Sequence, residues 1–438
     1  MPGAENNKRQ GEKVIGDLLY ACPLCKRFDA IVRSGRRAIC SNCGAQIERR
    51  GRLLGVNGRF QDCAWWFDQV AHLPGPHEEH VTAGSVGTPE YSLLSKGAVL
   101  RQAVPSGRCR TFAGGQAELE RMQVVDEGRV ALTDETLEFL GQAQRWSFPW
   151  QEVTCVTTDA HYFVFKVREK RCFQVRFLYE SPLKWERLCR QALVTFWRRR
   201  AGKEVLEFQP HITFGWPVRA EGRQLVPEPT SGPATREPLA SRLLYNALKM
   251  TMGLILRALF AVGLEGRHHV PSRGPFILVI NHEGYLDSFF TLALLPRKVA
   301  YLAKNTEFKN KAITWLLRQL RAIPVRRHEI DPSVVRNALR VLAAGEPVGI
   351  FVEGERTWDG RPLPPKVSTV RLLLRAGVPI VPVLIQNSLA VLPRWDSRPQ
   401  RHQVRIKVGA PFRLTFAAEE LPAASAFLMQ RIFSLGGK

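Results

Sequence analysis

The sequence predicts three consecutive structural parts: a small cysteine-stapled module, a mainly antiparallel β domain and a C-terminal α/β domain with a largely parallel sheet. Two closely spaced cysteine pairs near the N-terminus indicate the first part. Short segments rich in Val, Phe and Thr, which alternate in polarity between residues 122 and 178, indicate the second. Apolar strand-like runs that alternate with helical patterns from residue 275 onward indicate the third.

Composition and charge narrow the class of protein. The chain has 438 residues, of which 24% are charged and 45% belong to the hydrophobic set, which excludes a disordered or low-complexity chain. Lys and Arg number 63 against 40 Asp and Glu, a net charge of +23. Residues 241–438 hold 29 basic and 13 acidic residues, so they contribute +16 of this charge. We therefore expect an anionic partner to meet the C-terminal half.

The nine cysteines are expected to act as thiols or metal ligands, because the first 17 residues lack the apolar core of a signal peptide and indicate a cytoplasmic protein. Cys22 and Cys25 form one CxxC pair, and Cys40 and Cys43 form a second after fourteen intervening residues. This spacing is typical of a Cys₄ zinc ribbon, here placed at residues 1–55. Four thiolates leave no open coordination position, so the expected ion is a structural Zn²⁺, with iron or unligated cysteines as alternatives.

Basic residues surround the ribbon and leave a nucleic-acid interface open as an alternative role. They are Arg33, Arg36, Arg37, Arg49, Arg50 and Arg52. The sequence shows no second basic module with interleaved aromatic residues beside them. A solvated basic face is therefore the preferred interpretation, and nucleic acid is not among the expected partners.

The middle of the chain is interpreted as helix, loop and β domain. Residues 61–73 have the apolar spacing of a short helix, and residues 74–115, rich in Gly, Pro and Ser, are typical of a loop; together they fill residues 56–120. The β domain follows at residues 121–214 and closes with a helix capped by Ser181. Its predicted strands are residues 130–132, 137–140, 153–157, 162–167 and 172–178.

Several strands followed by one long helix resemble a GRAM or PH-like domain. The segment GRVALTDETLEFLG, residues 128–141, is similar to the opening hairpin of that family. The resemblance implies docking to a membrane or a protein rather than chemistry. A spacer that only packs on its neighbours is the alternative.

A linker and an amphipathic helix are predicted before the α/β domain. Residues 215–240 contain five prolines and show no apolar periodicity, so they are interpreted as the linker. Residues 241–266 have apolar stretches that Lys249 and Arg257 interrupt, so neither stretch is long enough to span a bilayer. This pattern favours a helix that lies in a membrane interface, and a buried core helix is the alternative.

The α/β domain is placed at residues 241–438. Its predicted strands are residues 276–280, 299–303, 323–325, 348–352 and 380–385, and its predicted helices are residues 286–295, 312–320 and 334–344. Parallel sheets bind ligands at the carboxyl ends of their strands. His282 and Asp287 directly follow the first strand, where the carboxylate can accept from one ring nitrogen and leave the other facing the cleft as a base. Glu353 and Arg356 follow the strand at residues 348–352, at the same edge.

These blocks resemble the glycerolipid acyltransferase family of lysophosphatidic acid acyltransferase type, over roughly residues 245–410. Asn281, His282 and Asp287 meet the NHx₄D block. The other three blocks follow in the family's order: Arg327 in a basic strand block, Glu353, Gly354 and Arg356 in an EGTR-type block, and residues 378–382 in a proline block. The resemblance implies an α/β acyltransferase domain.

The resemblance also implies a reaction and its site residues. His282 would take a proton from an acceptor hydroxyl, and Asp287 would orient its ring. Arg327 and Arg356 would hold the acceptor's phosphate, with Glu353 and Gly354 beside them. The implied donor is acyl-CoA or acyl carrier protein, the implied acceptor is a lysophospholipid such as 1-acylglycerol 3-phosphate, and no catalytic metal is expected.

Together these inferences predict a phospholipid-synthesising acyltransferase attached peripherally to the cytoplasmic face of an anionic membrane. Departures from the family pattern, such as Val352 for Pro and Glu355 for Thr or Gly, leave the acceptor open. Two other classes remain as alternatives. One is a catalytically silent lipid-binding or scaffold protein, and the other is a nucleic-acid-binding protein that uses the basic ribbon.

Overall fold

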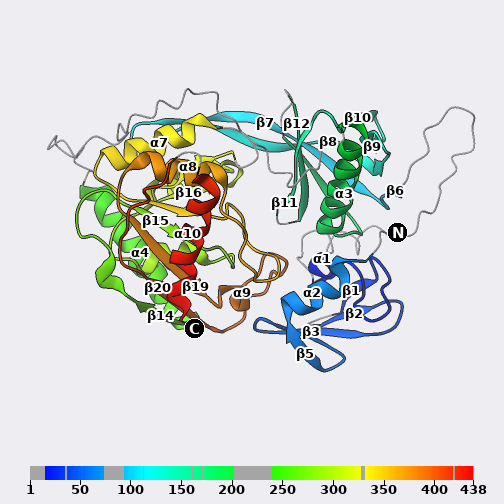
Figure 1. Ribbon diagram of the computed structural model, residues 1–438, viewed down its shortest axis with the longest axis horizontal. Helices are drawn as coiled ribbons and strands as arrows, with labels where there is room; N and C mark the ends of the chain where they lie inside the picture. Colours follow the sequence, from blue (N-terminus) through cyan, green and yellow to red (C-terminus); the bar gives the residue numbers. More distant parts are fainter. Residues whose placement is uncertain are drawn as a thin grey trace, which may run out of the picture. The chain divides into compact units, whose positions relative to one another are not determined.

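The chain forms two compact units in the computed structural model (Figure 1). The structure describes residues 15–34, 37–73, 93–111, 113–159, 161–168, 172–201, 239–326, 331–417 and 420–437. The first unit consists of Met1–Val104, Arg121–His211 and Arg394–Arg398, and the second consists of Pro105–Glu120, Ile212–Pro393 and Pro399–Lys438. Each unit therefore includes a short segment that is distant in sequence from the rest of it.

The first unit begins with a small antiparallel sheet in the order β1-β2-β3-β4-β5. Its strands are β1 Ile31–Ser34, β2 Arg37–Cys40, β3 Gln46–Arg50, β4 Leu53–Val56 and β5 Arg59–Asp62, and a short helix α1 Ile15–Leu18 precedes them. The helix α2 Cys63–Ala71 confirms the prediction for residues 61–73. Its buried Trp66 donates from the indole nitrogen to the Leu54 carbonyl oxygen over 2.6 Å, which holds the helix on the sheet.

A larger antiparallel sheet follows, in the order β10-β9-β8-β7-β13-β12-β11, with β6 beside β8. Its strands are β6 Leu93–Leu94, β7 Ala98–Arg110, β8 Gln116–Leu132, β9 Thr136–Gly141, β10 Arg145–Pro149, β11 Val153–Asp159, β12 Tyr162–Val167 and β13 Cys172–Phe177. All five predicted strands are confirmed. The hairpin expected at residues 128–141 is present, because Gly128 pairs with Gly141 and Leu132 with Leu137.

The helix α3 Pro182–Ala201 closes this sheet, as predicted. The Ser181 hydroxyl accepts from the Leu183 backbone nitrogen at 3.2 Å, which satisfies one of the free donors of the first turn. Trp185 and Leu193 of α3 belong to the buried core of the sheet. The amphipathic sequence of α3 thus serves to cover one face of the β domain.

The loop expected over residues 74–115 is wrong for its second half. Residues 74–92 lie outside the described residues, but Ala98–Arg110 forms β7 and Gln116 begins β8. β7 pairs with β13, from Ala98 opposite Phe177 to Gln102 opposite Phe173. This tertiary pairing outweighs the local preference of its Pro and Gly residues for turns.

The second unit is built on a sheet in the order β14-β20-β19-β15-β18-β16-β17. The strands are β14 Ala261–Glu265, β15 Ile277–Ile280, β16 Ala300–Lys304, β17 Ile323–Val325, β18 Val348–Phe351, β19 Ile380–Gln386 and β20 Gln403–Val408. β15 runs parallel to both β18 and β19, and β16 runs parallel to β17 and β18. β20 runs antiparallel to β19, so the sheet is largely parallel, as predicted, with an antiparallel step near one edge.

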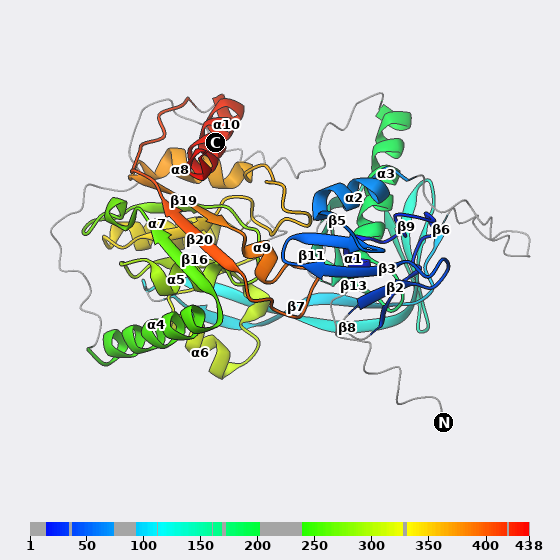
Figure 2. The same ribbon diagram turned by 90° about the horizontal axis from the view of Figure 1, so that it is seen from below.

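Helices cover both faces of this sheet (Figure 2). They are α4 Leu239–Leu259, α5 Asp287–Leu294, α6 Lys311–Gln319, α7 Pro332–Ala343, α8 Val367–Ala376, α9 Ser388–Val391 and α10 Leu421–Phe433. One core joins buried residues of the sheet to α7, α8 and α10, and another joins the opposite face to α4 and α5. The architecture is a three-layer α/β/α sandwich.

The helix expected over residues 241–266 ends earlier than predicted. α4 stops at Leu259, and Ala261–Glu265 forms β14, which pairs in parallel with β20 from Ala261 opposite Gln403. Buried Phe260 marks the change of direction. The linker predicted at residues 215–240 lies outside the described residues, except for its last two.

Candidate functional site

The candidate site lies at the carboxyl edge of the parallel strands. β15 ends at Ile280, and the Asn281 side chain continues its ladder: its amide nitrogen donates to the Ile385 carbonyl oxygen over 2.9 Å and its amide oxygen accepts from the Ile385 nitrogen over 2.7 Å. Asn281 is buried. These two bonds fasten the loop after β15 to β19 and fix where the next residue, His282, is placed.

His282 and Asp287 are in direct contact. Nδ1 of His282 lies 2.9 Å from Oδ2 of Asp287, and the same oxygen accepts from the backbone nitrogens of Glu283 at 2.8 Å and Gly284 at 2.9 Å. Asp287 is fully buried and opens α5, where the helix dipole favours a negative charge. A carboxylate that accepts from Nδ1 keeps the proton on that nitrogen and leaves the lone pair on Nε2.

Neighbouring groups hold the His282 ring and backbone. The ring stacks on Phe351, the last residue of β18, with centroids 4.2 Å apart. The His282 carbonyl oxygen accepts from the Thr357 nitrogen at 3.0 Å. Gly284 has no room for a side chain, because a Cβ would lie 2.6 Å from the Ser388 carbonyl oxygen. The loop that carries His282 is therefore held by contacts to Phe351, Thr357 and Ser388.

Glu353 is brought to the same place as His282. Its Oε1 accepts from the His282 nitrogen at 3.1 Å and its Oε2 accepts from the Leu363 nitrogen at 3.0 Å. Burial raises the pKa of Glu353 to about 8; the two backbone donors lower it, and the nearby carboxylates of Asp287 and Glu355 add to the rise. The arrangement gives Glu353 a positioning contact to the histidine loop that sequence reasoning did not foresee.

This burial predicts a pH dependence of stability. The folded-state pKa of Glu353 is raised to about 8, above the ordinary value of 4.5, so the folded protein holds a proton that the unfolded chain has lost. The free energy of unfolding should therefore fall as pH rises from about 5 to 8. Urea unfolding of wild type and Glu353→Gln at both pH values checks this, because Gln cannot titrate. Equal pH dependence in the two proteins would contradict it.

Gly354 and Arg356 stand in the turn after β18. Gly354 has a φ of +70°, a conformation that favours glycine, and a Cβ there would lie 2.8 Å from Cγ of Lys366. The half-buried Arg356 guanidinium lies over the Tyr285 ring, 4.6 Å from its centroid. This contact places the positive charge of Arg356 beside the loop that carries His282.

Arg327 lies outside the described residues. Its neighbour Arg326 forms ion pairs with Asp331 at 3.1 Å and Glu118 at 3.8 Å. Glu118 belongs to the segment Pro105–Glu120, which is part of this unit. Sequence reasoning had no signal for that segment, because it precedes the α/β domain by more than a hundred residues.

The four predicted metal ligands form a cluster in the first unit. The sulfur atoms of Cys22, Cys25, Cys40 and Cys43 all lie within 4.8 Å of one another. Sγ atoms of Cys22 and Cys43 are 3.7 Å apart, as are those of Cys25 and Cys40. Tetrahedral Zn–S bonds of about 2.3 Å require sulfur atoms about 3.8 Å apart, so the cluster fits a metal ion.

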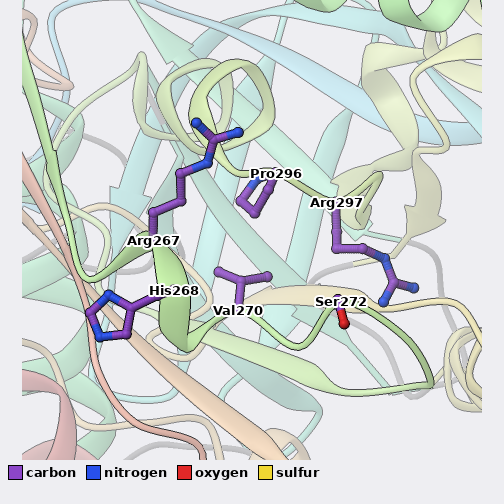
Figure 3. A pocket seen from close by; sticks show the side chains of 6 residues that line it. All are labelled: Arg267, His268, Val270, Ser272, Pro296 and Arg297. Carbon is purple, nitrogen blue, oxygen red and sulfur yellow. The ribbon is translucent and has the colours of Figure 1, made fainter.

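A separate hollow of about 630 Å³ lies at the other end of β15 (Figure 3). It is lined by Arg267, His268, Val270, Ser272, Pro296 and Arg297. The Arg297 guanidinium already donates to three carbonyl oxygens, those of Pro271, Gly274 and Gly345. The lining residues precede β15 and β16, whereas His282 follows β15, so the hollow is not part of the candidate site.

The fold and this site together define an α/β enzyme class in which a buried His–Asp pair stands at the carboxyl edge of a sheet. A family model described as Acyltransferase matches residues 261–386 of the chain. The matched residues include both members of the His–Asp pair and the turn after β18.

Curated proteins named as 1-acyl-sn-glycerol-3-phosphate acyltransferases are similar to part of this chain. A 1-acyl-sn-glycerol-3-phosphate acyltransferase of Bacillus subtilis is 29% identical over 199 residues, which are 44% of this chain and 95% of that protein. A 1-acyl-sn-glycerol-3-phosphate acyltransferase alpha of Mus musculus is 28% identical over 169 residues, 36% of this chain and 59% of its own length. The chain thus spans nearly all of the bacterial relative and little more than half of the mouse one.

A solved structure is also similar to part of this chain. It is the crystal structure of the 1-acyl-sn-glycerophosphate (LPA) acyltransferase PlsC from Thermotoga maritima. The sequence identity is 24% and the TM-score is 0.40, and the match covers 45% of this chain and 82% of that one.

Proposed function

We propose that the protein transfers a fatty acyl group from acyl-CoA or acyl carrier protein to a hydroxyl of 1-acylglycerol 3-phosphate or a related lysophospholipid. The observation that carries this proposal is the 2.9 Å contact between His282 Nδ1 and Asp287 Oδ2, which keeps the proton on Nδ1 and assigns the role of base to Nε2. The family match over residues 261–386 and the names of the relatives support it.

The proposed reaction is a direct transfer. Nε2 of His282 removes the proton of the acceptor hydroxyl while that oxygen attacks the thioester carbonyl carbon. The C–O bond forms, the C–S bond breaks, and the departing thiolate takes the proton back from the imidazolium. Asp287 stabilises the charged ring during the transfer. A thioester is already activated, so the step needs no nucleotide.

The proposed acceptor site uses the turn after β18. Arg356 would bind the acceptor's phosphate through its guanidinium fork, and Gly354 would let the backbone approach the substrate. Arg327 is proposed as a second phosphate ligand. Glu353 would order the turn against the His282 loop, as its bonds to the nitrogens of His282 and Leu363 support.

Removing Arg356 should weaken binding of phosphate-bearing acceptors. Arg356→Ala is expected to raise KM for lysophosphatidic acid about 10- to 100-fold, since charge-assisted hydrogen bonds contribute about 1.5–3 kcal/mol. Initial rates over a range of acceptor concentrations measure this effect. The exposed Arg375 of α8 provides a matched control, Arg375→Ala, with the same loss of charge. An equal rise of KM for an acceptor without phosphate would contradict the assignment.

The proposed attachment to membranes rests on α4 and α6. Within the described residues, none of the helices is both long and apolar enough to cross a bilayer. α4 nevertheless exposes large apolar side chains: Leu239, Leu243, Met250, Leu254, Ile255 and Leu259 are each more than half exposed. Beside it, α6 exposes Trp315 and buries none of its residues. Exposed Arg242 and Arg257 lie among these apolar residues on the same helix, as expected of a helix lying in an anionic interface.

A charge placed on this stripe should release the protein from vesicles. Leu254→Asp is expected to lower binding to anionic vesicles about tenfold or more, because one buried Leu contributes about 1.5–3 kcal/mol. Cosedimentation with phosphatidylglycerol vesicles measures the effect. The control is Val367→Asp, an exposed apolar position on α8, which covers the other face of the sheet. A loss of similar size in this control would refute a docking role for α4.

The parts before the α/β domain are proposed to serve binding. The cysteine cluster would hold a structural Zn²⁺ that staples the ribbon, and the larger β sheet with α3 would act as a PH/GRAM-like docking domain. The alternative of a catalytically silent domain would be favoured by an Asp287 turned away from His282. In the structure Asp287 faces His282, so the enzymatic proposal is preferred.

The experiment that tests the proposed function is acyl transfer by the purified protein. Labelled acyl-CoA of several chain lengths and lysophosphatidic acid in vesicles are the substrates, and labelled phosphatidic acid is the expected product. Absence of product with both acyl-CoA and acyl carrier protein donors would overturn the proposal.

A further inference from the structure

The hollow at the amino end of β15 gathers basic groups of the α/β unit. Arg267 and Arg297 line it, and Figure 3 shows their side chains on either side of Pro296. The His268 ring also lines the hollow, but it packs against the His269 ring, with centroids 4.1 Å apart. All of the lining residues belong to the second unit, so the hollow lies within one compact part of the chain.

Lys249 adds a further cation beside the hollow. This half-buried lysine of α4 donates from Nζ to the carbonyl oxygen of Leu295, the residue directly before the lining residue Pro296. Burial and the positive charges of Arg267 and Lys298 lower the pKa of Lys249 to about 8. Like charges in a partly buried place repel one another, and an anion bound between them relieves this repulsion. The arrangement therefore favours a ligand with negative charge.

The carboxylate of Glu346 compensates other cations of this region. Its Oε2 lies 3.1 Å from Nη1 of Arg321 and 3.9 Å from Nη2 of Arg297. Arg297 also donates to three backbone carbonyl oxygens, as described above. Within the part of the chain that the structure describes, neither Arg267 nor Lys249 forms an ion pair with a carboxylate. These two side chains are therefore the ones that a bound anion would neutralise.

Lys249 also connects the hollow with the apolar stripe of α4. It is next to Met250, which is 68% exposed and belongs to that stripe. A helix that lies in a membrane interface with its apolar face among the acyl chains is at the level of the lipid headgroups. In the attachment proposed above, the basic groups beside the hollow are therefore at the level of the lipid phosphates. This position favours a lipid phosphate over a soluble one.

We propose that the hollow is a second anion site, separate from the candidate site, which binds the phosphate group of an anionic membrane lipid through Arg267 and Lys249. The Arg267 guanidinium can donate to two phosphate oxygens at once, and the Lys249 ammonium supplies a point charge. Val270 and Pro296 offer apolar walls to the rest of the lipid. His268 is not among the proposed ligands. The proposal rests on the membrane attachment through α4 that was proposed above.

Calorimetric binding of dihexanoyl phosphatidylglycerol to the full chain tests this site, because this short-chain lipid is soluble as a monomer and needs no bilayer. Arg267→Ala and the nearly isosteric Lys249→Met are each expected to weaken binding at least about tenfold, since each removes a charge-assisted contact. The matched control is Arg336→Ala, which removes an exposed arginine from α7, on the other face of the sheet. This control should change the affinity less than about twofold.

A second titration, with inorganic phosphate, separates a lipid phosphate from a free one. Phosphate is expected to bind at least about tenfold more weakly than the lipid, because it gains nothing from the apolar walls. Equal affinity for inorganic phosphate would overturn the proposal, as would unchanged lipid binding in Arg267→Ala or an equal loss in Arg336→Ala. The proposed function fails separately: a protein without acyl transfer that binds the lipid through Arg267 supports the site, whereas an active protein whose lipid binding does not depend on Arg267 refutes it.

Discussion

His282→Ala is expected to abolish acyl transfer, with a loss of about 10²- to 10⁴-fold in kcat/KM. The reason is that His282 is the proposed base, and its ring is oriented at the carboxyl edge of the sheet by the buried Asp287 carboxylate 2.9 Å away. The variant should keep its thermal midpoint within a few degrees, because the smaller side chain leaves Asp287 bonded to the nitrogens of Glu283 and Gly284. Initial rates with labelled acyl-CoA and circular dichroism provide the two measurements.

Two further variants sharpen this result. Asp287→Asn should also lower kcat strongly, because the amide no longer stabilises the imidazolium or fixes its tautomer. His268→Ala is the matched control: His268 is exposed and lines the hollow at the opposite end of β15. Full activity of His282→Ala, or an equal loss in His268→Ala, would remove His282 as the base.

Loss of the proposed Zn²⁺ is expected to be the second large effect. Replacing Cys25 and Cys40 together by Ser is expected to reduce the zinc content from about one atom per chain to none and to unfold the cysteine-rich sheet. Structural zinc sites contribute on the order of 10 kcal/mol to the folding of small modules, and β1 and β2 contribute little apolar core of their own. Metal analysis and hydrogen exchange over residues 37–62 measure both effects.

Cys63→Ser is the control for this experiment. Cys63 lies in the same module but outside the cluster, and its thiol donates to the Arg52 carbonyl oxygen, a bond that a serine hydroxyl can also make. Retention of zinc by the double variant, or a folded sheet without metal, would contradict the structural role.

Local signals were sufficient for much of the fold. The CxxC spacing places four cysteines whose sulfur atoms do cluster, and alternation predicts β12 at the residues observed. His282 and Asp287 could be paired from the sequence because only five positions separate them and a strand end precedes them. These features depend on neighbours along the chain, so periodicity and spacing capture them.

Strand pairings between residues far apart in the chain could not be predicted from the sequence. β7 contains Pro105 and Gly107, which favour turns, yet its residues 98–102 pair with β13, more than seventy positions later. β14 was merged with the preceding helix because only its partner β20 makes it a strand. At the site, the bonds of Asn281 to Ile385 and of Glu353 to Leu363 depend on the folded backbone, which no local pattern encodes.

The most direct test of the central claim is acyl transfer by the purified full chain to lysophosphatidic acid in vesicles, with His282→Ala assayed in parallel. The account predicts labelled phosphatidic acid from the wild type, with acyl-CoA or acyl carrier protein as donor, and none from the variant. Equal product from both proteins, or no product from the wild type with either donor, would contradict it.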